Sequence, residues 1–255
     1  MTLHVECRGA GPDVVLIHGW GLDGSIWDTT AAWLAPRFRL WVVDLPGHGL
    51  SPLADARAFQ LDAVADAVRA AVPPGAVWVG WSLGALVAMA AAVTGPHAVA
   101  RLALVAGTPR FTCAPDWPYG IRADVLDTFA ADLERDYEGT LNRFLSLQTR
   151  GSAAARATLR TLRRRPVRHA PALDALRGGL ALLRDTDLRA RLHALSVETL
   201  VLAGGRDTLV PAAASQALAR ALPRARIEMF PEAGHVPFLS HPAAFHAALE
   251  GLLHG

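Results

Sequence analysis

The sequence predicts an α/β fold, in which an open, mostly parallel sheet carries helices on both faces. Short apolar runs rich in β-branched residues have the pattern of buried strands, and helix-like stretches such as 61–72 and 212–222 separate several of them. The alternation stops between 111 and 195, where amphipathic Arg-, Ala- and Leu-rich segments replace the strands. We therefore expect a core formed by 1–110 and 196–255 with a helical cap, 111–195, inserted into it. The strand-like runs are 14–17, 40–43, 77–79, 102–105, 200–202 and 227–230.

Length and composition narrow the class of protein. The chain has 255 residues, of which 52% are hydrophobic and 19% charged, so it can bury a large core. A net charge of +2 does not by itself imply binding to nucleic acid or to a membrane. The sequence contains no Lys, which excludes a lysine Schiff base or general base. Cys7 and Cys113 lack the spacing of a zinc site, so we expect no metal.

The sequence also leads to expectations about where in the cell the protein lies. The N-terminus has no basic stretch followed by an apolar one, so we expect no secretory signal and a cytoplasmic protein. Residues 76–93 carry no charge and have the composition of a transmembrane span. However, Gly80, Ser82 and Gly84 lie in the middle of this stretch, between a strand-like and a helix-like half. We therefore expect a buried strand that turns into a buried helix.

A G-x-S-x-G motif at 80–84 lies directly after a predicted strand and directly before a predicted helix. Such a motif also arises by chance, but this context is the one in which it forms a nucleophile elbow. Glycines at both flanks permit a turn too tight for side chains, and the helix N-terminus favours developing negative charge. The sequence therefore predicts Ser82 as a nucleophile.

A serine nucleophile needs a base within hydrogen-bonding reach and an acid that orients the base. In this type of fold the chain order is serine, acid, histidine. Asp207 follows the predicted strand 200–202, and His235 follows the strand 227–230, so both side chains should reach the same sheet edge as Ser82. We predict a triad of these three residues. The rival candidates that do not directly follow a strand are Asp187, His241 and His246.

Ester hydrolysis also requires two backbone N–H groups that stabilise the oxyanion. One should belong to Leu83, which follows the nucleophile. The other should belong to Trp20, within an H-G-W-G sequence that follows the strand 14–17. We also expect the Trp20 indole to wall the acyl pocket. A simple glycine turn at 18–21 is the alternative.

The motifs H-G-W-G, D-L-P-G-H-G-x-S, G-W-S-L-G, G-G-R-D and G-H, in this order, resemble those of the α/β-hydrolase superfamily over nearly the whole chain. We interpret the second motif, at 44–51, as structural, since it forms neither G-x-G-x-x-G nor a P-loop. Within the superfamily, the chain resembles the esterases that hydrolyse the pimeloyl methyl ester on acyl carrier protein in biotin synthesis. The segments that carry this closer resemblance are 18–22, 80–84, 116–118, 143–149, 180–188 and 240–242.

This resemblance implies a serine esterase that has a helical cap and no cofactor, with acyl carrier protein as the partner that presents the substrate. It also implies a set of substrate-binding residues. They are Trp20, Ser82, Leu83, Phe144, Leu145, Ser146, Leu147, Gln148 and His235.

The charge pattern of the cap points to the same partner. Residues 139–170 include eight arginines and no Asp or Glu. Four of them, at 156, 160, 163 and 164, have the spacing of one helix face. A basic ridge would attract an acidic carrier protein, although a solvated arginine face is the simpler alternative. Nucleic acid is a weaker candidate, because no aromatic residues alternate with the arginines. The candidate partner-binding residues are Arg143, Arg156, Arg160 and Arg164.

Other functions remain open at this point. A general carboxylesterase for small soluble esters would use the same triad, and a carbon–carbon bond hydrolase also keeps the serine. A dehalogenase or epoxide hydrolase would need Asp at position 82, which is Ser. A non-catalytic ligand receptor on the same scaffold is the alternative from another class. We expect a monomer that binds neither nucleic acid nor membrane.

Overall fold

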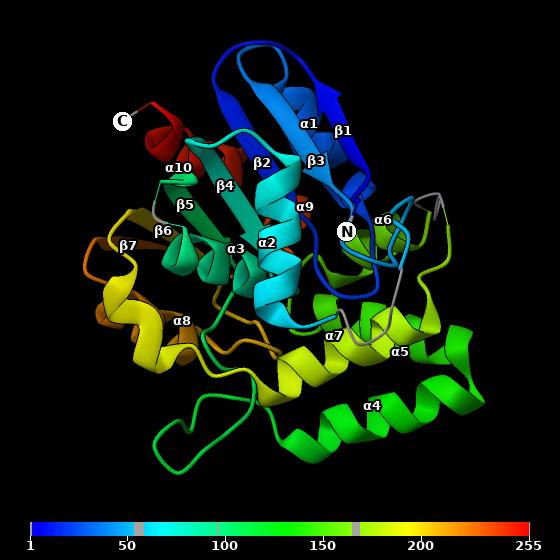
Figure 1. Ribbon diagram of the computed structural model, residues 1–255. Helices are drawn as coiled ribbons and strands as arrows, with labels where there is room; N and C mark the ends of the chain where they lie inside the picture. The colour runs from blue at the N-terminus through cyan, green and yellow to red at the C-terminus, as the bar shows by residue number, and fades with distance from the viewer. Residues whose placement is uncertain (1, 54–58, 96, 165–168, 255) are drawn as a thin grey trace.

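The computed structural model describes residues 2–53, 59–95, 97–164 and 169–254, and its described strands form one sheet (Figure 1). The strand order is β1-β3-β2-β4-β5-β6-β7, and all neighbours are parallel except β1 and β3. Each of the six predicted runs lies in a strand, which confirms the mostly parallel sheet. The strands are β1 Val5–Arg8, β2 Asp13–Ile17, β3 Arg39–Val43, β4 Ala76–Trp81, β5 Val99–Val105, β6 Glu198–Gly204 and β7 Ala225–Phe230.

Helices cover both faces of the sheet, as Figure 1 shows. α2 Leu61–Ala71, α3 Leu83–Thr94 and α8 Ala212–Ala221 share one apolar core with Val15 and Ile17 of β2. α1 Asp28–Leu34, α9 Pro237–Ser240 and α10 Pro242–Leu253 share a second core with Val14 and Leu16 of the same strand. Because successive strand residues point to opposite faces, the apolar run 14–17 of this strand contributes to both cores.

The uncharged stretch 76–93 is a buried strand followed by a buried helix. Every residue of β4 is buried, and so are ten of the twelve residues of α3. A helix that is apolar on all sides is stable when other elements surround it, and here α2 and the sheet do so. Among the described residues, no helix combines the length and apolarity needed to cross a membrane.

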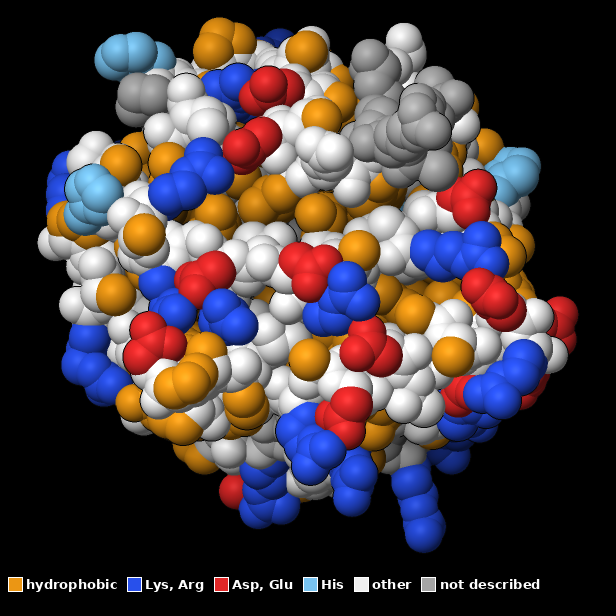
Figure 2. All heavy atoms as spheres, turned by 60° about the horizontal axis from the view of Figure 1, so that its bottom comes forward, with side chains coloured by type: hydrophobic (Ala, Val, Ile, Leu, Met, Phe, Trp, Pro, Cys, Tyr) orange, Lys and Arg blue, Asp and Glu red, His pale blue; other side chains and the backbone are white. Residues whose placement is uncertain are grey.

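In the described part of 106–197, four α-helices lie between β5 and β6, within the segment expected to form the cap. They are α4 Ala123–Arg135, α5 Tyr137–Thr149, α6 Ala155–Arg164 and α7 Leu173–Asp185, followed by the 3-10 helix η3 Arg189–Ala194. Ion pairs connect α4 to α7: Arg177 with Glu134 at 2.7 Å and Arg184 with Asp127 at 2.9 Å. Figure 2 shows this side of the molecule, where basic and acidic side chains adjoin one another.

Candidate active site

Ser82 lies at the tight turn between β4 and α3. Its backbone has φ 56° and ψ −114°, a strained conformation for a residue other than glycine. A Cβ at Gly80 would lie 2.3 Å from the carbonyl oxygen of Gly84, and a Cβ at Gly84 would lie 2.5 Å from that of Ile17. Both glycines are therefore required where the helix passes close to the sheet.

The side chains of Ser82, His235 and Asp207 form one hydrogen-bonded chain. His235 Nδ1 lies 2.7 Å from Asp207 Oδ2, and its Nε2 lies 2.9 Å from Ser82 Oγ. All three residues are buried. Because a carboxylate can only accept, Nδ1 donates to Asp207, and the lone pair of Nε2 is free to accept the serine proton.

Neighbouring groups hold both the acid and the base in place. The other carboxylate oxygen of Asp207 accepts hydrogen bonds from the backbone N–H groups of Leu209 at 2.8 Å and Val210 at 3.0 Å. The backbone N–H of His235 donates to the carbonyl of Gln148 on α5, at 3.0 Å. Its carbonyl accepts from the Trp81 indole N–H at 2.8 Å. The sequence reasoning missed this role of Trp81, although Trp81 precedes the serine in the motif.

The predicted oxyanion loop lies against the nucleophile. A Cβ placed on Gly19 would be 3.2 Å from the Cβ of Ser82 and 2.9 Å from the Trp81 ring. Within the described part of the chain, the backbone N–H groups of Trp20 and Leu83 donate to no protein acceptor. Two free amides beside the serine are what an oxyanion requires.

Two buried histidines connect this loop to the 44–51 segment by hydrogen bonds. The ring of His18 accepts from the backbone N–H of Leu45 at 2.9 Å, and that of His48 accepts from Gly21 N–H at 3.4 Å. Burial lowers the pKa of both rings, that of His48 to about 3. Both rings are therefore neutral acceptors near neutral pH. The 44–51 segment is structural, as expected, and it positions the loop that contains Trp20.

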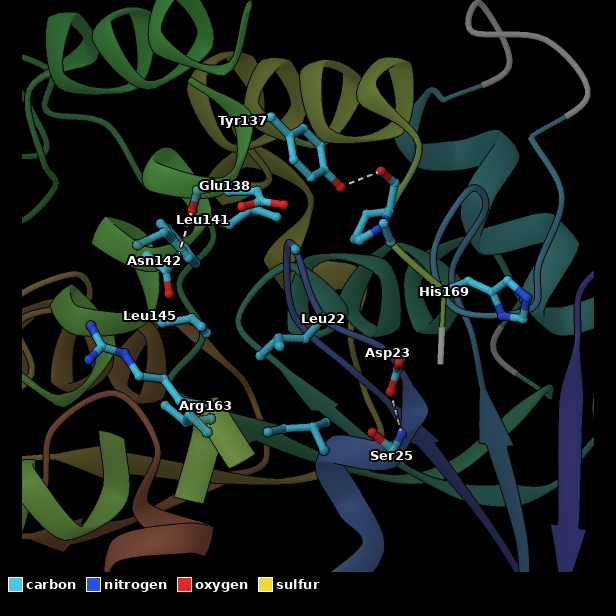
Figure 3. A pocket seen from close by; sticks show the side chains of 16 residues that line it. Leu22, Asp23, Ser25, Tyr137, Glu138, Leu141, Asn142, Leu145, Arg163 and His169 are labelled. Carbon is cyan, nitrogen blue, oxygen red and sulfur yellow. Dashed lines mark hydrogen bonds between the residues drawn. The ribbon is translucent and has the colours of Figure 1, made fainter. Parts of the chain in front are cut away.

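Two cavities lie on either side of Phe144. An inner cavity of about 20 Å³ is bounded by Ser82, His235 and apolar side chains of the cap and the core. An outer cavity of about 390 Å³ lies between the loop at 21–26 and the cap helices α5 and α6 (Figure 3). Phe144 lines both cavities, and Leu145 lines the outer one.

The expectation that the Trp20 indole walls a pocket needs correction. Its N–H donates to the carbonyl of Leu176 on α7 at 2.8 Å, and its ring packs edge-on against Phe144 with centroids 4.5 Å apart. Phe144 therefore forms part of the wall of both cavities, and the Trp20 ring packs against Phe144 without lining either cavity. Several residues implied by the resemblance line neither cavity. They are Trp20, Leu83, Ser146, Leu147 and Gln148.

The arginines of the cap divide into two groups. Arg156, Arg160, Arg163 and Arg164 are exposed on the face of α6 opposite the buried residues Thr158 and Leu162, and we call these four the arginine row. Within the described residues, none of the row forms an ion pair with a carboxylate. Arg143 differs, because it pairs with Asp132 at 3.0 Å and Asp136 at 3.4 Å. Arg165 and Arg168 lie outside the described residues.

The rival triad candidates have other partners. Asp187 pairs with Arg189 and Arg110, which lowers the pKa of its carboxyl group. His241 contacts the hydroxyl of Ser240 at 2.8 Å. His246 stacks on Trp33 with ring centroids 4.3 Å apart. None of the three rival side chains contacts Ser82 within the described part of the chain.

Comparison with known proteins places the chain in a family. The family model described as "Alpha/beta hydrolase family" matches residues 14–248. The chain belongs to this family. One relative of this hydrolase, from Xanthomonas campestris pv. campestris (strain B100), is 48% identical over 240 residues and is named "Pimeloyl-[acyl-carrier protein] methyl ester esterase"; 94% of each chain is covered. A protein of the same name from Stenotrophomonas maltophilia (strain K279a) is 47% identical, over 97% of this chain and 95% of the relative.

Solved structures share the fold of the hydrolase. An esterase from Exiguobacterium antarcticum superposes with a TM-score of 0.88 at 23% identity, and the match covers 99% of this chain and 96% of the esterase. At this level of identity the similarity concerns the fold alone. Function in this fold depends on the residues at the strand ends.

Proposed function

We propose that this hydrolase is a serine carboxylesterase that cleaves the methyl ester of a pimeloyl group carried by acyl carrier protein. The hydrogen-bonded chain from Asp207 through His235 to Ser82 is the observation that carries the reaction type. The substrate is inferred from relatives of that name, which are 47–48% identical over nearly the full length.

The geometry supports a two-step reaction. Nε2 of His235 takes the proton of Ser82 Oγ as the oxygen attacks the ester carbonyl, and the backbone N–H groups of Trp20 and Leu83 stabilise the oxyanion. The tetrahedral intermediate collapses, protonated His235 gives its proton to the methoxide, and methanol leaves. His235 then activates a water molecule that hydrolyses the acyl-serine, and the free carboxylic acid is released.

The arginine row is the proposed docking surface for the carrier protein. Arg156, Arg160 and Arg164 project from one side of α6 and have no carboxylate partner within the described residues, so their charges remain available to an acidic partner. Arg143 contributes less, because Asp132 and Asp136 already offset its charge. These two ion pairs therefore weaken the prediction from the sequence that Arg143 binds the partner.

A comparison of two substrates tests the proposal. We expect kcat/KM to be at least a hundred-fold higher for the carrier-bound methyl ester than for methyl butyrate, because only the former can use the docking surface. Equal values would indicate a general carboxylesterase. Complementation of a strain that lacks the pimeloyl-ester esterase provides the cellular test, with Ser82→Ala as the matched control. Growth restored by the Ser82→Ala variant as well as by the wild-type protein would contradict the proposal.

We also propose that the enzyme works as a monomer in the cytoplasm, where a carrier-bound biosynthetic substrate would be met. Size-exclusion chromatography with light scattering tests the monomer, and a dimer at micromolar concentration would refute it. Cell fractionation tests the compartment.

A further inference from the structure

Trp81 is the last residue of β4 and directly precedes the nucleophile. Its side chain is fully buried in the second apolar core, which also contains Val14 and Leu16 of β2. A large apolar side chain in such a place is most often a packing residue. The contacts of Trp81, however, extend to two other parts of the catalytic machinery.

The first contact is with the backbone of the general base. The indole N–H of Trp81 donates to the carbonyl of His235 at 2.8 Å, and the N–H of His235 donates to the carbonyl of Gln148 at 3.0 Å. Both backbone polar groups of His235 are therefore bonded, in addition to its ring. His235 is buried, so water is not at hand to replace the indole. Without the indole N–H, the buried carbonyl would lack a partner, and the segment would shift to find one.

The second contact is with the loop that contains the Trp20 amide. A Cβ placed on Gly19 would lie 2.9 Å from Cε3 and 3.0 Å from Cζ3 of Trp81, so the ring lies directly against the backbone of Gly19. Both carbons belong to the six-membered ring, whereas Nε1 belongs to the five-membered ring. One rigid indole therefore contacts the oxyanion loop with one part and the segment of the general base with the other.

We propose that Trp81 is a positioning residue that sets the general base and the oxyanion loop at their working distances from Ser82. A misplacement of reacting groups by about 1 Å can lower the rate roughly a hundred-fold, so a rigid connection among the three is of direct use. Trp81 lines neither of the two cavities and acts through His235 and Trp20. The inference rests on the serine-hydrolase reaction of the proposed function and is independent of the carrier protein.

Trp27 offers a matched comparison. It is as deeply buried as Trp81, and both rings pack against Phe238, with centroids 4.5 Å away for Trp27 and 5.3 Å away for Trp81. Within the described residues, however, the indole N–H of Trp27 has no acceptor. Replacement of either tryptophan by phenylalanine thus removes the same atoms from the same core, but only one replacement removes the bond to His235.

The two phenylalanine variants test the bond to the general base. With methyl butyrate, we expect Trp81→Phe to lower kcat at least about tenfold and to change KM by less than about threefold, because the displaced groups act on the transition state. Labelling of Ser82 by an alkyl fluorophosphonate should slow by a similar factor. Trp27→Phe should keep kcat and the labelling rate within about threefold of the wild type. A smaller loss in Trp81→Phe, or an equal loss in both variants, would overturn the positioning role.

Gly19→Ala tests the contact with the oxyanion loop. Its methyl group would lie 2.9 Å from the indole, so the ring or the loop must shift. We expect the resulting loss in kcat to be at least about threefold smaller in the Trp81→Phe background, because a phenyl ring leaves more room. The contact of this methyl group with the Cβ of Ser82, at 3.2 Å, is common to both backgrounds. Losses that simply multiply would show that the ring does not position the loop.

Thermal unfolding verifies that each variant folds, and rates are expressed per Ser82 that labels at completion. If Trp81→Phe does not fold, 3-benzothienylalanine at position 81 takes its place, because it has the same shape and carries sulfur instead of the N–H. The same loss in kcat is expected, and a loss below tenfold would again overturn the role. If the wild-type protein hydrolyses no ester, the proposed function fails, while the labelling rates still decide the role of Trp81.

Discussion

The Nε2 atom of His235 lies 2.9 Å from the Oγ atom of Ser82, although the two residues are 153 positions apart in the chain. The contact forms because β4 and β7 run parallel in one sheet, so the loops that follow them reach the same edge. The bond between His235 and Asp207 fixes the tautomer that this contact needs.

Removal of the hydroxyl at position 82 should abolish ester hydrolysis. We expect Ser82→Ala to lower kcat by at least about a thousand-fold, because no other group replaces the nucleophile. The unfolding temperature should stay near that of the wild type, since the change removes one oxygen atom. Steady-state kinetics with methyl butyrate and thermal unfolding measure the two effects. Activity within tenfold of the wild type would refute the assignment.

Asp207→Asn should lower kcat by about three orders of magnitude with little change in KM. The amide of Asn can donate to Nδ1, which would move the ring proton to Nε2 and leave no lone pair for the serine. The hydrogen bonds from Leu209 and Val210 can still reach the amide oxygen, so the loop should persist. Kinetics at saturating substrate measure the effect. A decrease of less than about tenfold would contradict this role of Asp207.

Charge reversal on the arginine row should weaken carrier docking. We expect Arg156→Glu with Arg160→Glu to raise KM for the carrier-bound ester at least tenfold more than for methyl butyrate, and added salt should reduce the difference. Arg135→Glu on α4 is the control, because it makes one of the same Arg-to-Glu changes, half the charge change of the double variant, at an exposed position outside the row. An equal effect of the double variant on both esters would argue against docking at this surface.

The stability of the protein should depend on the protonation of His48. Its pKa is about 3 in the fold and ordinarily about 6.5, so between these values the unfolded chain binds more protons. The free energy of unfolding therefore falls as the pH drops through this window, and His48 contributes about 2 kcal/mol of the loss between pH 7.5 and pH 5. His18, whose pKa is also lowered by burial, acts in the same direction.

Urea unfolding of His48→Gln measures this contribution. The glutamine oxygen can still accept from Gly21 N–H but does not titrate, so the loss between pH 7.5 and pH 5 should shrink by about 2 kcal/mol. A pH dependence identical to that of the wild type would show that His48 binds protons equally in both states.

The sequence predicted the sheet and the triad because both depend on local patterns. Apolar runs marked the six parallel strands, and Asp207 and His235 each follow one of them. β1 was missed, because Val5–Arg8 is a four-residue edge strand with exposed Cys7 and charged Glu6 and Arg8, and it lacks the pattern of a buried strand. Its antiparallel pairing with β3 follows from contacts that no local pattern specifies.

Side-chain directions and long-range pairs could not be predicted. The Trp20 indole donates a hydrogen bond to the carbonyl of Leu176, which is 156 residues away in the chain. The H-G-W-G motif predicted where the backbone of Trp20 lies, but it contains no information about the direction of the side chain. Arg143 is neutralised by Asp132 and Asp136, which lie before the stretch that has no acidic residue. The outer cavity arises from the packing of α5 and α6 on the loop at 21–26.

The most direct test of the account is the site of covalent labelling. Treatment with an alkyl fluorophosphonate followed by peptide mass spectrometry should give one adduct, on Ser82, because among the hydroxyl groups that the structure describes this one is hydrogen-bonded to His235 Nε2 beside two free amides. His235→Ala should label at least a hundred-fold more slowly, and Ser82→Ala should not label. Rapid labelling of a different residue, or none in a protein that hydrolyses the methyl ester, would contradict the account.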